Sequence, residues 1–200
     1  MIARLNATLR RLPPGAVYLL GLLPLAWIVW LTLSGGIGVD PVKGIEHRLG
    51  KVGLWFLAGG LAITPLLRLT RLNLIRYRRA IGLLAFFYIA LHLVAWVWLD
   101  MGLLWRQAAR DLVKRPYLVL GISAFALLIP LALSSNDASV RRLRAGWRRL
   151  HRLVYPAVLL GVAHYLWQMK VISLEGWAWA AAVAALLTLR FPGLIRPGRS

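Results

Sequence analysis

The chain alternates between long apolar runs and short segments rich in arginine. Six runs carry almost no charge in their centres, at about residues 15–33, 52–67, 80–99, 117–133, 150–168 and 176–189. A helix needs about 20 mostly apolar residues to cross a bilayer, and these runs have or approach that length. Such continuous runs disfavour a membrane barrel, whose strands alternate. The pattern predicts an all-α integral membrane protein, a six-transmembrane-helix bundle that forms one domain over residues 1–200.

The charged residues give this predicted bundle an orientation. If the first run starts in the cytoplasm, 17 of the 25 Lys and Arg residues fall on the cytoplasmic side. Five of the six acidic residues fall on the opposite side. Short cytoplasmic loops of membrane proteins carry an excess of Lys and Arg. The charges therefore predict that the N- and C-termini are both cytoplasmic.

Composition agrees with a membrane protein and narrows the chemistry. The mean hydropathy is +0.69 and 60% of the residues are hydrophobic. A net charge of +19 would by itself suggest nucleic-acid binding, but the charges lie in clusters between uncharged runs. The chain has no cysteine, which excludes disulfides, iron–sulfur clusters and thiolate metal sites. Histidine is the strong nitrogen or sulfur ligand that remains.

Two histidines are predicted to lie at similar depth in the membrane. His92 is twelve residues into the third run and His164 fourteen residues into the fifth, and both runs start from the cytoplasmic side. At 1.5 Å per residue they lie roughly 18 and 21 Å from that side. Facing side chains in helix bundles build haem sites, and two imidazoles give a six-coordinate haem iron suited to electron transfer. We favour ligation over a hydrogen bond between helices for this pair.

The other two histidines carry weaker signals. His151 lies near the cytoplasmic end of the fifth run, and the sequence opposite it, around residues 78–80, offers no histidine. On a straight helix His151 also points roughly 140° away from His164, although Pro156 lies between them and favours a kink. Haem ligation and an interfacial role are equally open from residue chemistry. His47 is predicted in an outer loop that begins at Asp40-Pro41, where a solvated histidine is the expected reading.

Other features are explained first by membrane structure. The arginine clusters "RLTRLNLIRYRR" and "VRRLRAGWRRLHR" fit topology and anionic lipid, with haem propionates or a flavin phosphate as alternative partners. Gly59, Gly60 and Gly161 favour close helix packing, or leave room for a flat macrocycle. No phosphate-binding loop, dinucleotide fingerprint or Ser-His-Asp pattern is present in the sequence.

The chain resembles a known family through most of its length. It is similar to the MsrQ family, the haem-binding membrane subunits of bacterial periplasmic methionine sulfoxide reductase systems, within the ferric-reductase-like transmembrane superfamily. The stretches that carry the resemblance are "GGIGVDPVKGIEHRLG", "ITPLLRL", "RRAIGLLAFFYIALHL", "RPYLVLGI", "WRRLHRLVYPAVLLGVAHYLW" and "LTLRF".

The resemblance implies a function and a set of haem ligands. It implies haem b in a bundle of the bacterial inner membrane, with His92, His164 and His151 as axial ligands of haem iron. Electrons would come from a cytoplasmic flavin reductase or the quinol pool and pass to a periplasmic molybdopterin-containing methionine sulfoxide reductase. That partner, and not this chain, would reduce the substrate. The resemblance also implies FMN, for which the sequence shows no site.

Two alternatives remain at the level of sequence. A transmembrane ferric or cupric reductase would use the same haem path, but the short outer loops lack an obvious cluster of acids to gather a metal ion. A transporter or structural membrane subunit is the alternative from another class. Ion-coupled carriers ordinarily place acidic or basic relay residues inside their spans, and the centres of these runs lack Asp, Glu and Lys.

Overall fold

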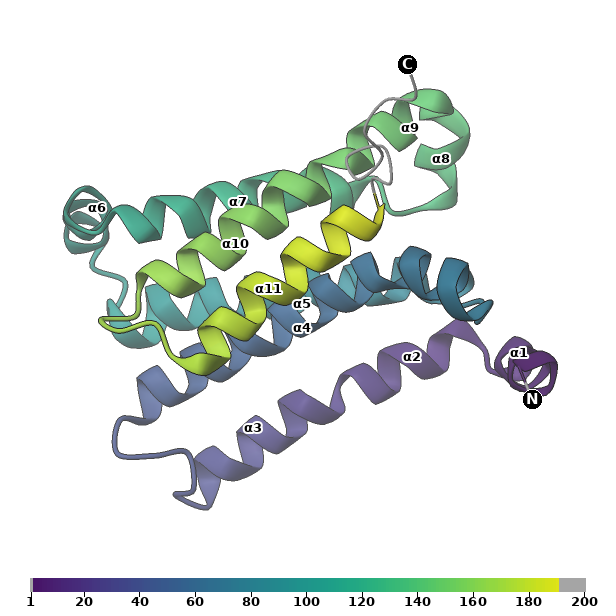
Figure 1. Cartoon of the computed structure of the whole chain (residues 1–200). Helices are drawn as coiled ribbons and strands as arrows, with labels where there is room; N and C mark the ends of the chain where they lie inside the picture. The colour runs from purple at the N-terminus through teal and green to yellow at the C-terminus, as the bar shows by residue number, and fades with distance from the viewer. Residues whose placement is uncertain (1, 191–200) are drawn as a thin grey trace.

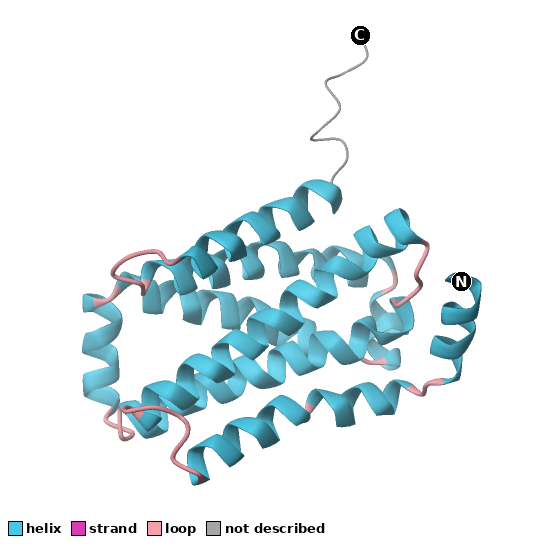
Figure 2. Cartoon of the chain, turned by 60° about the horizontal axis from the view of Figure 1, so that its bottom comes forward, coloured by secondary structure: helices cyan, strands magenta, loops and turns pink. Residues whose placement is uncertain are grey.

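The computed structural model describes residues 2–190, which form helices joined by short connections without a strand (Figures 1 and 2). The first half contains α1 (Ile2–Arg11), α2 (Pro14–Gly21), α3 (Leu23–Leu33), α4 (Pro41–Thr70), the 3₁₀ turn η1 (Ile75–Tyr77), α5 (Arg78–Ala95) and the π-helical turn η2 (Trp96–Asp100). The second half contains α6 (Trp105–Lys114), α7 (Pro116–Leu133), α8 (Asp137–Leu143), α9 (Ala145–Leu150), the 3₁₀ turn η3 (His151–Leu153), α10 (Val154–Trp167) and α11 (Leu174–Arg190). The all-α prediction is confirmed.

The long helices lie lengthwise beside one another. In Figure 1, α4, α5, α7, α10 and α11 form the bundle, and α2 and α3 follow one another along one side. The main core cluster draws buried residues from α4, α5, α7, α10 and α11, and a second cluster joins α3 to α4 and α5. The short helix α6 lies at one end of the bundle, while α1, α8 and α9 lie at the other (Figure 1).

Four helical segments are long and apolar enough to cross a membrane. They are Pro14–Leu33, Pro41–Thr70, Ile75–Asp100 and Pro116–Leu133. The fifth and sixth predicted runs are helical as well, but α10 has 14 residues and α11 has 17. The structure therefore supports a membrane protein with four spans by length and composition, and the count of six stays a prediction.

The helix α4 starts earlier than the sequence suggested, which corrects the placement of His47. Asp40 caps the helix, because its side chain accepts a hydrogen bond from the Lys43 backbone N–H. Pro41 occupies the first helical position, where its missing N–H costs nothing. The Asp-Pro pair thus begins a helix and does not make a turn in a loop. His47 lies on the second turn of α4.

The first span is broken at Pro24, and a tyrosine from α5 repairs the break. The fully buried Tyr88 donates its hydroxyl proton to the Gly21 carbonyl at 2.6 Å and accepts the Leu25 backbone N–H at 3.0 Å. In an intact helix these two backbone groups would bond to each other. The tyrosine hydroxyl is therefore inserted into the hydrogen-bond ladder, and it fixes α2 and α3 against α5.

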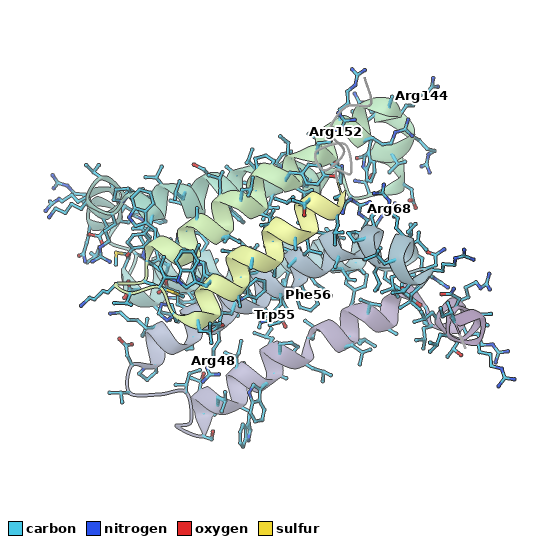
Figure 3. The ribbon with its side chains drawn as sticks, in the orientation of Figure 1. Arg48, Trp55, Phe56, Arg68, Arg144 and Arg152 are labelled. Carbon is cyan, nitrogen blue, oxygen red and sulfur yellow. The ribbon has the colours of Figure 1, made fainter. Side chains whose placement is uncertain are left out.

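Arginines gather at one end of the bundle. Figure 3 shows Arg68, Arg144 and Arg152 at the end where α1 lies, and Arg48 toward the opposite end. At the arginine-rich end, Arg79 pairs with Asp137 at 2.6 Å and so holds the pKa of that exposed carboxyl below its usual range. Within the described residues this asymmetry follows the predicted distribution of charge. The predicted cytoplasmic arginines 196 and 199 lie outside the described residues.

Candidate functional site

His92 and His164 lie close to each other inside the bundle. His92 comes from α5 and His164 from α10, and their ring centroids are 6.1 Å apart. An imidazole nitrogen lies about 2 Å from a bound transition metal and its ring centre about 1 Å farther, so two imidazoles on opposite sides of one iron have centres roughly 6 Å apart. The observed separation fits such a pair.

Each of these imidazoles is held by a backbone carbonyl. His92 Nδ1 lies 2.8 Å from the Glu46 carbonyl oxygen on α4, and His164 Nδ1 lies 2.7 Å from the Tyr117 carbonyl oxygen on α7. A carbonyl only accepts, so both Nδ1 atoms carry the proton and donate it. The unprotonated Nε2 of each ring is then the nitrogen available to a metal, which is the usual arrangement of a metal-binding histidine.

Two glycines allow the rings to lie close to neighbouring helices. A Cβ on Gly50 of α4 would stand 3.1 Å from His92 Nδ1. A Cβ on Gly121 of α7 would stand 2.9 Å from His164 Nδ1. Both distances are shorter than ordinary contact, so a side chain at either position would displace the imidazole that it touches.

The histidines line a cavity of about 790 Å³ between α4, α5, α7 and α10. Gly161, one turn before His164, also lines it, and a Cβ there would meet no atom within 4 Å. This open position agrees with the predicted room for a flat macrocycle. By contrast, neither Gly59 nor Gly60 lines the cavity, so these glycines leave no such room.

The cavity has one apolar and one polar end. The apolar end is lined by Leu54, Leu57, Ala124, Phe125, Leu128 and Ala157. The polar end is lined by Lys43, Glu46, His47, Arg48, Lys51, Asp100, Arg115, Gln168 and Glu175. An amphipathic group with a flat apolar body and charged substituents fits this lining. Within residues 2–190 no group of three or more His, Asp or Glu side chains is arranged to hold a bare metal ion.

The π-helical turn η2 adds two residues to the cavity wall. It follows the helix that carries His92, and its first residue, Trp96, is 7% exposed and lines the cavity. Its last residue, Asp100, lines the polar end. Turns of this kind are frequently found at functional sites. The sequence did not identify Trp96, Asp100, Gly50 or Gly121 as residues of the site. Gly50 and Gly121 lie on α4 and α7 and approach the histidines only in the folded bundle.

The structure separates His151 from this pair. His151 begins η3, stacks on Trp147 with ring centroids 3.8 Å apart, and does not line the cavity. Its Nδ1 lies 3.1 Å from the Trp147 carbonyl oxygen, so it is the donor, while its Nε2 is buried without a hydrogen-bond partner. Pro156 lies in the first turn of α10, and the chain before it forms the 3₁₀ turn. The other three histidines, His47, His92 and His164, all line the cavity.

His47 lines the cavity, whereas the predicted arginine clusters do not. His47 lines the polar end of the cavity but is exposed. The two cationic guanidinium groups at the polar end belong to Arg48 and Arg115, and neither comes from the predicted arginine clusters. Those clusters lie outside the cavity lining, so the structure gives them no part in holding a group beside His92 and His164.

Comparison with known proteins gives one matching family model and close relatives. The model of the ferric reductase like transmembrane component matches residues 49–162, more than half of the chain. This segment includes His92, Gly121 and His151 and ends two residues before His164. No solved structure matches.

Three similar proteins carry the name "Protein-methionine-sulfoxide reductase heme-binding subunit MsrQ". The protein from Agrobacterium fabrum is 44% identical over 191 residues, which cover 94% of this chain and 87% of the relative. Proteins from Brucella ovis and Brucella anthropi are 44% and 42% identical over 181 residues, covering 90% of this chain and 81% of each relative.

Proposed function

The chain belongs to the ferric-reductase-like transmembrane family and to the MsrQ heme-binding subunits, and we propose that it is a membrane electron-transfer subunit that binds haem b between His92 and His164. The observation that carries this proposal is the pair of imidazoles, 6.1 Å apart, whose Nδ1 atoms are fixed by carbonyls from two further helices. The haem iron would supply a one-electron carrier inside the membrane.

The residues around the pair would keep the site ready for electron transfer. The Glu46 and Tyr117 carbonyls hold each ring in one tautomer and one orientation. Gly50 and Gly121 let the rings lie against α4 and α7. The apolar end of the cavity keeps water away from one side, while Trp96 closes another wall. Because little has to move, oxidation and reduction would require small reorganisation of the protein.

The proposed topology places the two haem ligands nearer the periplasm than the cytoplasm. We propose six spans with both termini in the cytoplasm of a bacterium and the chain in its inner membrane. The excess of arginine at the end that holds α1, α8 and α9 supports this orientation. His92 and His164 then lie toward the periplasmic side, near the polar end of the cavity. An acceptor in the periplasm would therefore approach the haem more closely than a cytoplasmic donor.

The proposed partners follow from the relatives. The relatives' name supports a methionine sulfoxide reductase as acceptor, and we propose the periplasmic molybdopterin enzyme in that role. The donor would be a cytoplasmic flavin reductase or quinol. His151 is proposed as the ligand of a second haem, supported by its buried Nε2 that lacks a partner. FMN stays a prediction from family resemblance, and no residue contact supports a site for it.

Electron transfer to the partner tests this function. The purified protein would be reduced in detergent, and the catalytic subunit and methionine sulfoxide would then be added while the haem spectrum is followed. We expect reoxidation that requires both additions and that is lost in His92→Ala. Reoxidation by ferric or cupric salts at a rate that the catalytic subunit does not match would favour a metal reductase instead.

A further inference from the structure

The two ends of the cavity differ in what they can accept. A haem carries two propionate groups, and burying an unpaired carboxylate among apolar side chains is costly. The apolar end offers Leu57, Leu128, Ala157 and similar residues and gives no partner for such a charge. The propionates must therefore point to the polar end, where several donors line the wall.

One donor at the polar end lacks an acceptor. Tyr165, the residue after His164 on α10, lines the cavity and is 8% exposed. Its buried hydroxyl makes no hydrogen bond of ordinary length and angle, although the side chains of Lys51 and Glu175 lie close enough to interact with it. Buried polar groups almost always have a partner. Apart from His151 Nε2, which lies outside this cavity, it is the unsatisfied buried side-chain polar atom in the part of the chain that the structure describes.

A cation stands beside this hydroxyl at the level of the histidines. Lys51 follows Gly50, the residue against which His92 lies, and its side chain is 39% exposed. Lys51 Nζ is 2.8 Å from Glu175 at the start of α11. An ammonium group has three protons to donate, so Lys51 can serve Glu175 and a second carboxylate together.

From this geometry we propose that Lys51 and Tyr165 bind one propionate of the haem held by His92 and His164. Tyr165 donates its hydroxyl proton to the propionate, and Lys51 bridges the propionate and Glu175. Lys51 and Tyr165 then fix which edge of the macrocycle faces the polar end. The inference rests on the proposed function, since it needs haem in this cavity.

The role of Glu175 separates this proposal from a purely structural ion pair. If Lys51 and Glu175 only join α4 to α11, Glu175→Gln and Lys51→Met should weaken the protein alike. If Lys51 also binds a propionate, Glu175→Gln removes a competing negative charge. Haem should then be held at least as tightly as in the unchanged protein.

Haem retention in the full-length protein tests the proposal. The rate at which haem passes from the purified holoprotein to excess apomyoglobin would be measured for the unchanged chain and for Tyr165→Phe, Lys51→Met and Glu175→Gln. Lys170→Met is the matched control, because Lys170 is exposed and does not line the cavity. The same proteins would also be loaded with the dimethyl ester of haem, which has no propionate charge.

We expect Tyr165→Phe and Lys51→Met to lose haem on the order of tenfold faster, the scale of a hydrogen bond to a charged group. Glu175→Gln and Lys170→Met should not accelerate the loss. The dimethyl ester should leave the unchanged protein faster than haem does. Neither Tyr165→Phe nor Lys51→Met should increase the rate of ester loss further. The proposal would be overturned if all variants lost haem at the same rate. It would also be overturned if Tyr165→Phe and Lys51→Met accelerated the loss of the ester as much as the loss of haem. A protein that never binds haem would instead overturn the proposed function.

Discussion

Gly50 and Gly121 each leave the space that one histidine ring of the site occupies. Each lets an imidazole lie against the backbone of a helix that also offers the carbonyl for its Nδ1. A methyl group at either position would push the ring away from that carbonyl and change its orientation. Because the imidazole ring is rigid, this displacement would also move Nε2, the nitrogen that faces the metal.

We therefore predict that Gly50→Ala and Gly121→Ala each reduce haem affinity by roughly tenfold or more, the usual cost of disturbing the groups that orient a metal ligand. The haem content per protein and the low-spin signal in electron paramagnetic resonance measure this. Gly59→Ala and Gly82→Ala are controls, since a Cβ at either position meets no atom within 4 Å. Haem content that falls equally in all four variants would point to a general loss of stability.

The sequence predicted the two facing histidines but not the residues that pack against them or line the cavity beside them. His92 and His164 were found by counting residues from the helix ends, because the rise of a helix converts position into depth. Gly50 and Gly121 depend on which helices lie beside each ring, and Tyr165 depends on the absence of a partner in three dimensions. His47 was misplaced because Asp40-Pro41 was interpreted as a turn, whereas it caps a helix.

At the scale of elements, α2 and α3 depend on α5. Pro24 opens the first span, and the Tyr88 hydroxyl occupies the gap between Gly21 and Leu25. The proline could be seen in the sequence as the cause of a break. The tyrosine that fills the break could not, because it lies more than sixty residues away along the chain.

We predict that Tyr88→Phe destabilises the protein by about 1–3 kcal/mol, the usual cost of leaving buried polar groups without a partner. Thermal unfolding in detergent would show a lower midpoint. Tyr18→Phe serves as the control, because Tyr18 is 36% exposed. An unchanged midpoint for Tyr88→Phe would mean that Leu25 and Gly21 bond directly and that the break closes on its own.

The hairpin of α8 and α9 is tied to His151. Trp147 Nε1 donates to the Ser134 carbonyl at 2.9 Å, and the Trp147 ring stacks on His151.

We predict that His151→Ala keeps the principal low-spin haem signal of the His92–His164 pair but lowers total haem content or removes a second signal. A pyridine haemochrome assay beside the resonance spectrum measures both. Loss of the principal signal in this variant would contradict the separation of His151 from the cavity.

At the scale of the whole molecule, the helical form of the six apolar runs is confirmed, whereas their number as membrane spans and the orientation stay predictions. Of the predicted cytoplasmic arginines, Arg68, Arg144 and Arg152 lie at one end of the bundle (Figure 3). The ends of helices were predicted less well. The helix α4 gains eleven residues before the predicted start because a charged amphipathic segment continues it, and η2 changes from α- to π-helical pairing at Trp96.

The absence of cysteine makes the topology directly testable. We predict that Val171→Cys, in the loop between α10 and α11, reacts with a membrane-impermeant maleimide on intact spheroplasts. Ala145→Cys, at the first residue of α9, should react after lysis. Both positions are exposed. The reverse pattern would invert the proposed orientation and place the haem on the cytoplasmic side.

The account depends most on His92 and His164 holding one haem between them. The measurement that tests this most directly is the visible spectrum of the detergent-purified protein, oxidised and then reduced with dithionite, beside those of His92→Ala and His164→Ala. We predict a sharp b-type reduced spectrum whose principal low-spin signal disappears in either variant. A folded, monodisperse protein that carries no haem although haem was supplied during expression would contradict the account, as would an unchanged signal in both variants.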